Sequence, residues 1–265
     1  MDIFNTLLIH PMINGLVVIY HALTWLHAPF ALGFSIIIFT AIVRTLISPL
    51  MKGMLVQQKK MQEINPQLTK IKEKYKGDSR KQQMAQMELF KANGINPAAG
   101  CLPLLVQFPL FIALYQALLK IVSLHSVKDL NHLLYSGVPH LDRMWDTTFF
   151  GLPLGASPSA LLPKLGGAIV LVSVITGLLQ LFQSKMMAPS AAASKDKPKV
   201  DDFATTLQKQ MLFMVPVMIG FFSFTFPIGI TLYWNTFTIF GIIQQYKTQG
   251  WGGLADWLKY IKKKK

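Results

Sequence analysis

Hydrophobic positions along the chain fall into five long runs separated by polar segments, and this pattern predicts membrane-spanning helices. A helix rises about 1.5 Å per residue, so about 20 mostly apolar residues cross the ~30 Å core of a bilayer. The predicted spans cover residues 29–51, 99–122, 164–184, 209–226 and 227–247. A Pro-x-Gly turn at residues 227–229 separates the last two. The predicted fold is therefore an all-α integral membrane protein with a five-helix transmembrane bundle.

Composition supports a membrane protein with basic loops. The 265 residues are 52% hydrophobic and only 14% charged, with a mean hydropathy of +0.39, whereas soluble domains are about 25% charged. Lys and Arg outnumber Asp and Glu by 26 to 12, a net charge of +14. The single cysteine, Cys101, excludes an intramolecular disulfide framework and a CxxC site. We expect no secretory signal peptide, because Asp2 is the only charge before Arg44.

The distribution of basic residues between the loops predicts the orientation. Ten Lys and Arg residues lie in the loop 52–95, five lie in residues 185–209 and six follow residue 246, whereas four lie on the other side. Cytoplasmic loops carry an excess of positive charge. The loop 52–95, the linker 185–208 and the tail 248–265 are therefore predicted to be cytoplasmic. The loop 123–163 and the N-terminus are predicted to lie outside.

Residues 1–28 are apolar but contain several polar side chains, which leaves two interpretations open. The segment includes Asn5, Pro11, Asn14 and three histidines, of which His10 is the first, and it has no charge after Asp2. We expect an N-terminal interfacial helix on the external side of the membrane. The alternative is a sixth span, which would place the N-terminus in the cytoplasm.

The loop 52–95 has the periodicity of amphipathic helices. Its apolar residues recur at spacings of three and four, at Met54, Leu55, Met61, Ile64, Leu68, Ile71 and Tyr75. Asn65 before Pro66 suits a helix start, Asp78 or Ser79 suits the cap of a second helix, and Gly94 suits its end. The prediction is a basic cytoplasmic αα-hairpin. Residues 185–208, by contrast, have the Pro, Ala, Ser and Lys composition of a linker.

Arg44 interrupts the first predicted span and is the strongest candidate for a functional residue. It lies seven residues before Met51, or ~10 Å from the predicted cytoplasmic end of the span. An arginine inside a span costs roughly 2.5–3.5 kcal/mol on insertion scales, so it is expected to face the bundle interior or a water-filled cavity. The alternative is that its guanidinium snorkels to the cytoplasmic headgroups.

Polar side chains on the other spans are candidates to line a pocket around Arg44. The candidate lining residues are Gln107, Ser173, Thr176, Gln180, Asn235 and Thr238. One polar residue per span would only hold helices together. A group of them with an arginine and no acidic residue predicts a hydrated, positively charged pocket. The lack of Asp and Glu within the spans argues against a proton pump or a cation-coupled transporter.

Enzyme motifs are missing from the sequence. The six histidines include no HExxH pair, and His125, His132 and His140 match no standard zinc spacing. There is no GxSxG motif and no Gly-rich phosphate loop. We therefore expect no enzymatic activity, no metal and no cofactor.

The C-terminal tail is strongly basic and suits two kinds of anionic partner. It ends in Lys262, Lys263, Lys264 and Lys265. Such a cluster binds either anionic lipid headgroups or the phosphates of ribosomal RNA, and the sequence leaves both open.

Three segments resemble signatures of the YidC-type membrane protein insertases, the YidC/Oxa/Alb family. The signature of their second span is similar to INPAAGCLPLLVQFPLFIALYQAL at residues 95–118, and that of their last span to FPIGITLYWNTFTIFGIIQQ at residues 226–245. Their arginine span and cytoplasmic hairpin resemble AIVRTLISPL and the following KMQEINPQLTKIKEKYKGD. The resemblance covers about residues 29–122 and 170–247, and it is to a short form without a large periplasmic domain.

The resemblance implies a membrane protein insertase or chaperone that acts without nucleotide hydrolysis. Such proteins move client transmembrane segments and short polar tails from the cytoplasm into the bilayer through a hydrophilic groove. Arg44 would supply the charge of the groove, and Tyr233 and Trp234 would lie along the client's path. One departure is Thr238, four residues after Trp234, where the family commonly has Asn; here Asn235 follows the Trp directly.

The resemblance also implies a location and partners. The location would be the bacterial inner membrane, as a multi-pass protein with its N-terminus outside and its C-terminus in the cytoplasm. The partners would be nascent membrane-protein clients and membrane lipids, with the ribosome, the signal recognition particle receptor and the Sec translocon as further partners, and no DNA.

Two other functional classes fit the same pattern of residues. An anion channel or small-solute transporter would use the pocket as a pore and would depend on Arg44 for conductance. A structural assembly factor would tolerate substitutions in the pocket and would be sensitive to substitutions on its surface.

Overall fold

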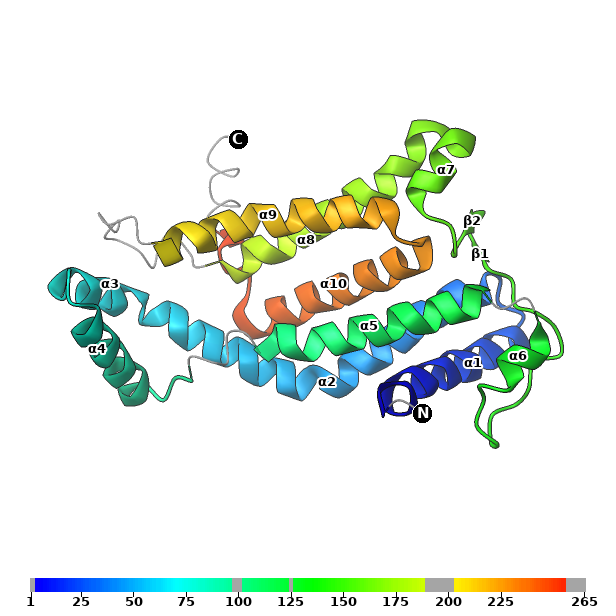
Figure 1. Ribbon diagram of the computed structural model, residues 1–265, viewed down its shortest axis with the longest axis horizontal. Coiled ribbons are helices and arrows are strands. Elements are labelled where there is room, and N and C mark those ends of the chain that lie inside the picture. Colours follow the sequence, from blue (N-terminus) through cyan, green and yellow to red (C-terminus); the bar gives the residue numbers. More distant parts are fainter. Residues whose placement is uncertain (1–2, 97–101, 124–125, 189–202, 256–265) are drawn as a thin grey trace. The chain divides into compact units, whose positions relative to one another are not determined.

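The structure is a computed structural model that describes residues 3–96, 102–123, 126–188 and 203–255 (Figure 1). The chain begins with a π-helix, Asn5–Ile9, which continues into α1. The helices that follow are α1 His10–Trp25, α2 Ala31–Glu63, α3 Asn65–Lys74, α4 Ser79–Ala92, α5 Leu102–Ser123, α6 Val127–Asn131, α7 Pro158–Leu165, α8 Val170–Met187, α9 Phe203–Thr225 and α10 Ile228–Gln249. A 3₁₀ turn, Gly166–Ile169, joins α7 to α8.

The predominantly helical fold is confirmed, with one small addition. Two short strands, β1 Thr148–Phe149 and β2 Leu152–Pro153, pair antiparallel within the loop 123–163, with Thr148 opposite Pro153. Phe150 and Gly151 form the turn of this hairpin, and both have positive φ angles. A two-residue strand carries no periodic pattern, so hydropathy could not reveal it.

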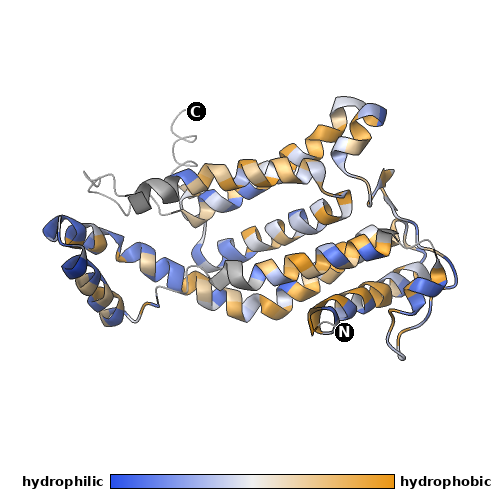
Figure 2. Cartoon of the chain, viewed as in Figure 1, coloured by the Kyte–Doolittle hydropathy of each residue, from blue (hydrophilic) through white to orange (hydrophobic). Residues whose placement is uncertain are grey.

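Several helices have the length and apolar composition needed to cross a membrane. Within the described residues these are Asn5–Trp25, Ala31–Glu63 and Pro158–Met187, with shorter apolar stretches at Gln107–Ile121 and Gln210–Thr225. Hydrophilic residues dominate α3 and α4, whereas hydrophobic residues dominate most of α5 and α8 (Figure 2). The positions of the five spans relative to a bilayer, and whether residues 1–28 lie on it or cross it, stay predictions.

The chain divides into two compact units, which are described separately. The first comprises Met1–Leu46, Val106–Leu179 and Val217–Phe240, and the second comprises Ile47–Leu105, Gln180–Pro216 and Gly241–Lys265. The core of the first unit contains a buried face of α1 and a buried face of α5. These faces consist of Ile9, Ile13, Leu16, Val17 and Tyr20 on the N-terminal helices, and Ala113, Leu114, Ala117, Leu118 and Ile121 on α5. Both sets recur at spacings of three and four, the periodicity of a helix packed on one side.

Hydrogen bonds in the first unit fasten α1 to the loop between α5 and α7. The Asn14 side chain is 4% exposed. Its Nδ2 donates to the carbonyl oxygens of His10 and Leu133, and its Oδ1 accepts from the backbone N–H of Tyr135 at 2.7 Å. The His21 ring nitrogen lies 3.0 Å from the Pro139 carbonyl oxygen. The loop therefore follows α1 for about two turns.

The second unit contains a helical hairpin, in which α3 contacts α4. Asp78 caps α4, because its carboxylate accepts from the backbone N–H of Lys81 at 3.0 Å. Gly94 follows α4 with a φ of 60°, the left-handed conformation that suits a helix end. Asn65 is not the cap of α3: the helix begins at Asn65 itself, and Ile64 precedes it without a side-chain cap.

Helix α2 continues well beyond Met51, where the apolar run ends. It runs to Glu63 with Pro49 inside it, and the expected boundary between span and hairpin therefore falls within one helix. Pro49 removes one backbone donor, and the helix persists because the residues after it are mostly Met, Leu, Gln and Lys, which are good helix formers.

Candidate functional site

Arg44 lies on α2 and is held by the backbone of α10. Its side chain is 5% exposed. Nε and Nη2 both donate to the carbonyl oxygen of Phe237, at 3.2 and 2.9 Å. The guanidinium carbon also lies 3.4 Å from the centre of the Phe237 ring. A carbonyl oxygen has two lone pairs and an aromatic ring has a negative face, so Phe237 alone makes both kinds of contact with Arg44 without a negative charge.

The charge of Arg44 is not neutralised by any described carboxylate. The ion pair that the described part of the chain shows, Lys81 with Asp78 at 3.0 Å, lies on the exposed hairpin. A guanidinium has five N–H groups, and Arg44 uses two of them on Phe237. The other three have no partner among residues 3–96, 102–123, 126–188 and 203–255, which leaves them for water or an anionic group.

Tyr233 and Gln107 form a second polar contact in the first unit. Gln107 Nε2 on α5 donates to the Tyr233 hydroxyl on α10 at 3.1 Å. Tyr233 is buried, and its ring centre lies 5.9 Å from that of Phe237, one helical turn away. The spacing of four residues on α10 therefore places Tyr233, which binds Gln107, next to Phe237, which binds Arg44.

Helix α10 carries buried polar side chains on two sides. Thr231, Tyr233, Thr236 and Thr238 are all buried. The Thr236 hydroxyl donates back to the Leu232 carbonyl oxygen at 2.8 Å. The Oδ1 of Asn235 is buried and has no partner among the described residues. At about 100° per residue, Thr231, Asn235 and Thr238 lie on one side of the helix and Tyr233 and Thr236 on the other, and a role for them in lining a groove stays a prediction.

Ser173 and Thr176 lie where α8 approaches α9. A Cβ added to Gly220 on α9 would lie 3.3 Å from the Gly177 Cα and 3.5 Å from the Ser173 carbonyl oxygen. Thr176 is buried and donates to Val172 at 2.8 Å, whereas the buried Ser173 hydroxyl has no partner within the described chain. These contacts are those of close helix packing, and a role for both residues in lining a groove stays a prediction.

The remaining predicted site residues are divided between the two units and the part outside the description. Trp234 is half-buried in the first unit, edge-on to Phe111 with ring centres 5.2 Å apart. Gln180 is half-buried in the second unit. Lys262, Lys263, Lys264 and Lys265 lie outside the described residues.

Sequence patterns did not predict the contacts of a group of glutamines in the second unit. Gln58 and Gln62 on α2 both donate to the Met187 carbonyl oxygen at the end of α8, at 3.2 and 2.9 Å. Gln244 donates to the Ser48 carbonyl oxygen at 3.0 Å. At Met187 two amide side chains thus satisfy a free carbonyl at a helix end, which charged residues or glycine more often do. The acceptors of these glutamines are backbone atoms, which sequence patterns do not reveal.

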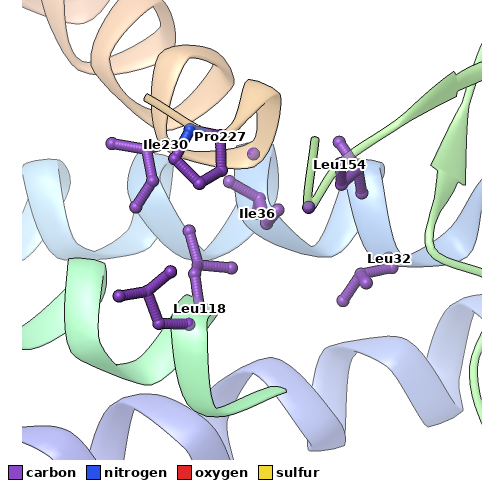
Figure 3. A pocket seen from close by; sticks show the side chains of 9 residues that line it. Leu32, Ile36, Leu118, Leu154, Pro227 and Ile230 are labelled. Atoms are coloured by element: carbon purple, nitrogen blue, oxygen red, sulfur yellow. The ribbon is translucent and has the colours of Figure 1, made fainter. Parts of the chain in front are cut away.

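A cavity in the first unit is apolar, and Arg44 is not among the residues that line it. It has a volume of about 120 Å³ in the first unit. Side chains of α2, α5, the segment after β2 and the start of α10 point into it, including Leu32, Ile36, Leu118, Leu154 and Ile230 (Figure 3). An apolar cavity of this size stays dry, so it is distinct from the hydrated pocket predicted around Arg44.

Comparisons with known proteins agree in pointing to one family. Residues 25–251 match the sequence model of the family described as 60Kd inner membrane protein. The membrane protein insertase YidC of Oceanobacillus iheyensis is 37% identical over 219 residues, which are 80% of this chain and 72% of the relative. The chloroplastic ALBINO3-like protein 1 of Arabidopsis thaliana is 32% identical over 90% of this chain and 47% of its own length.

A solved structure shows the same fold. The structure described as an active YidC insertase crystal structure with the first transmembrane domain resolved has a TM-score of 0.56 and 26% sequence identity. The match covers 94% of this chain and 47% of that one. The chain therefore spans about half the length of this structure and of the plant relative, and most of the length of the Oceanobacillus relative.

Proposed function

The chain belongs to the 60Kd inner membrane protein family, which includes the YidC insertases, and on that premise we propose that it inserts membrane proteins. Its clients are transmembrane segments with short polar tails, which pass from the cytoplasm into the bilayer without nucleotide hydrolysis. We place it in a bacterial inner membrane as a multi-pass protein with an external N-terminus and a cytoplasmic C-terminus, following the excess of basic residues in the loops assigned to the cytoplasm.

The observation that carries the proposal is a buried arginine without a carboxylate partner among the described residues. Arg44 keeps three N–H groups after bonding to Phe237. A client carboxylate 4 Å from such a cation gains on the order of 4 kcal/mol at an effective dielectric constant of 20. This attraction offsets part of the cost of moving a polar tail out of water, and it is lost again once the tail reaches the external solution.

Tyr233 and Gln107 support passage by offering polar groups close to the Phe237 that holds Arg44, and Asn235 offers a buried side-chain oxygen elsewhere on α10. The contact between Gln107 and Tyr233 is a neutral hydrogen bond, which is typically worth only about 0.6 kcal/mol in a membrane protein. Because the bond is weak, Gln107 and Tyr233 can release each other and bond to a passing client instead without a large barrier. We propose that Gln107, Ser173, Thr176, Gln180, Asn235 and Thr238 line the hydrophilic groove and that clients pass along Tyr233 and Trp234.

The client's own apolar segment supplies the driving force. Each buried CH₂ group contributes about 0.8 kcal/mol on transfer from water, so a span of 20 residues needs no external energy source. The polar groove lowers the barrier and leaves the end states unchanged. The basic tail would contact membrane lipids or the ribosome, and the signal recognition particle receptor and the Sec translocon are proposed as further partners.

The test is insertion into liposomes that contain only the purified protein. The client is a single-span protein with a short acidic external tail, scored by protease protection, and a second client carries Asn in place of the acidic residues. Arg44→Gln keeps a donor for the Phe237 carbonyl and removes the charge. We expect this variant to insert the acidic client about tenfold more slowly, which corresponds to ~1.4 kcal/mol, and the neutral client nearly normally.

Two controls separate the outcomes. Lys128→Ala removes one positive charge from an exposed position of the first unit and should insert both clients like the wild type. Thermal unfolding in detergent checks that Arg44→Gln is folded. Equal rates for the two clients with Arg44→Gln would contradict a role for the charge, and no insertion above empty liposomes by the wild type would contradict the insertase proposal. Anion conductance without insertion would favour a channel.

A further inference from the structure

Three large apolar side chains of the first unit are exposed at the connection between α1 and α2 or on the turn that contacts it. Trp25 and Leu26, at the end of α1, are 80% and 65% exposed, and Phe150, in the turn between β1 and β2, is 67% exposed. Phe150 lies against Phe30, just before α2, with ring centres 4.8 Å apart. Exposed apolar groups that gather in one place mark an interaction surface.

The hairpin of β1 and β2 is fastened to α2 by the neighbouring Phe149. Gly33 provides the space for its ring, since a Cβ at Gly33 would lie 2.0 Å from a ring carbon of Phe149. Phe149 also packs edge-on against Phe34 and Phe30, with ring centres 5.4 and 6.1 Å apart. Phe149 therefore holds the hairpin against α2, whereas the next residue, Phe150, is exposed.

The backbone at this surface holds unfavourable conformations. Phe30 and Phe150 have φ angles of 54° and 49°, and His27 has 55°. The left-handed region is a genuine outlier for bulky side chains, and such strain persists only where the surroundings impose it, often at functional sites. Exposing the Phe150 ring to water would not offset the free energy of this backbone strain, whereas contact between the ring and lipid would.

The position of the surface along the chain identifies its partner. Helix α2 begins at Ala31 and has the length and apolar composition of a membrane span. Phe30 immediately precedes that span, so it lies at the edge of the bilayer, and the contacts of Phe149 and Phe150 with Phe30 place the hairpin turn at the same depth. The residues between Asp2 and Arg44 include no Asp, Glu, Lys or Arg that would favour water.

We propose that Trp25, Leu26 and Phe150 form an anchor that inserts into the headgroup region of the external leaflet. Tryptophan is enriched at this depth because its ring is apolar and its N–H group is polar. Phenylalanine and leucine occupy the boundary between headgroups and acyl chains in helices that lie on membranes. The anchor fixes the depth of the α1–α2 connection and of the hairpin relative to the bilayer.

The depth of spin labels tests this placement in vesicles of phosphatidylethanolamine and phosphatidylglycerol. In a Cys101→Ser background, a nitroxide is attached at Phe150→Cys or Trp25→Cys, and its accessibility to oxygen and to a water-soluble nickel complex is measured. Val174→Cys, on an exposed apolar position of α8, is the reference for the acyl chains. Ser136→Cys, exposed in the external loop, is the reference for water.

The anchor predicts intermediate depths for positions 150 and 25. A label at Phe150 that is as accessible to nickel as the one at Ser136 would overturn the proposal, and so would one as deep as the label at Val174. Adding Gly33→Ala displaces the Phe149 ring and should move the label at position 150 toward water, while the Val174 label stays in place. No shift with Gly33→Ala would contradict the role of the Gly33 notch.

The anchor is independent of the proposed insertion activity. The depths are measured without a client, and the same labelled proteins can be tested for insertion separately. Intermediate depths of the labels in a protein that does not insert clients would contradict the proposed function and support the anchor. Normal client insertion by a protein whose label at position 150 lies in water would contradict the anchor and support the proposed function.

Discussion

Replacing Asn14 by Ala should release the external loop from α1. Asn14 makes three hydrogen bonds, of which one stays within α1 and two reach the loop, to the Leu133 carbonyl oxygen at 3.1 Å and from the Tyr135 N–H at 2.7 Å. The substitution removes the side chain and leaves both loop groups without a partner. The sequence around Asn14 is apolar, so its neighbours on α1 cannot replace these bonds.

The expected loss of stability is about 2–4 kcal/mol. Each hydrogen bond contributes about 1 kcal/mol net, and a buried donor or acceptor left unpaired costs about 1–3 kcal/mol. The lost hydrogen bonds and the unpaired groups are partly the same effect, so their costs do not simply add. Water can also reach part of the loop because Tyr135 is exposed. The total is therefore smaller than the cost of leaving two fully buried groups unpaired. The matched control is Asn93→Ala, which removes one bond on an exposed helix end and should cost at most about 0.5 kcal/mol.

Unfolding by a denaturing detergent, followed by tryptophan fluorescence, measures the free energy, and hydrogen exchange locates the change. We expect the amide of Tyr135 to lose protection in Asn14→Ala and to keep it in Asn93→Ala. An unchanged free energy of unfolding, with Tyr135 still protected, would refute the reasoning that Asn14 holds the loop on α1.

Two further substitutions and one change of pH test other contacts. Gly220→Leu should cost about 1–3 kcal/mol in detergent unfolding by overpacking the contact with α8, whereas the same change at Gly53, which has no neighbour within 4 Å, should cost less. The backbone N–H of Lys81 donates to the Asp78 carboxylate and lowers the pKa of Asp78. The cap therefore stabilises α4 fully at any pH above the usual carboxylate pKa, and this stability is lost as the pH falls through the lowered pKa of Asp78. The helicity of α4, measured by NMR, should fall over that range, and unchanged helicity would contradict the cap. Gln62→Ala should increase hydrogen exchange in the last turn of α8, and unchanged exchange would exclude capping by this amide.

Local signals predicted much of the helical architecture. The cap at Asp78 and the left-handed Gly94 follow from residue types that each have one favourable local conformation. The continuation of α2 to Glu63 was not foreseen, because the apolar run ends at Met51 while helix propensity does not. Asn65 failed as a cap because the backbone at Ile64 is already close to helical, so the side chain of Asn65 lies inside the helix.

The candidate site was predictable in its residues and less so in its contacts. Arg44 stands out in any apolar run, and Tyr233 was selected through a resemblance. The partner of Arg44 is a main-chain carbonyl, and every residue carries one, so no pattern of side chains could identify Phe237. The same reasoning applies to Met187, whose carbonyl accepts from two glutamines.

The central claim is that clients pass the Arg44 site, and photocrosslinking tests it most directly. Benzoylphenylalanine replaces Phe237, next to Arg44, or Phe221, which is exposed on α9 of the same unit. A ribosome-bound client with an acidic tail is halted during insertion. The account predicts crosslinks from position 237 to the tail that disappear with Arg44→Gln, and crosslinks from position 221 only to the apolar segment. Insertion that proceeds without any crosslink from position 237 would contradict the account.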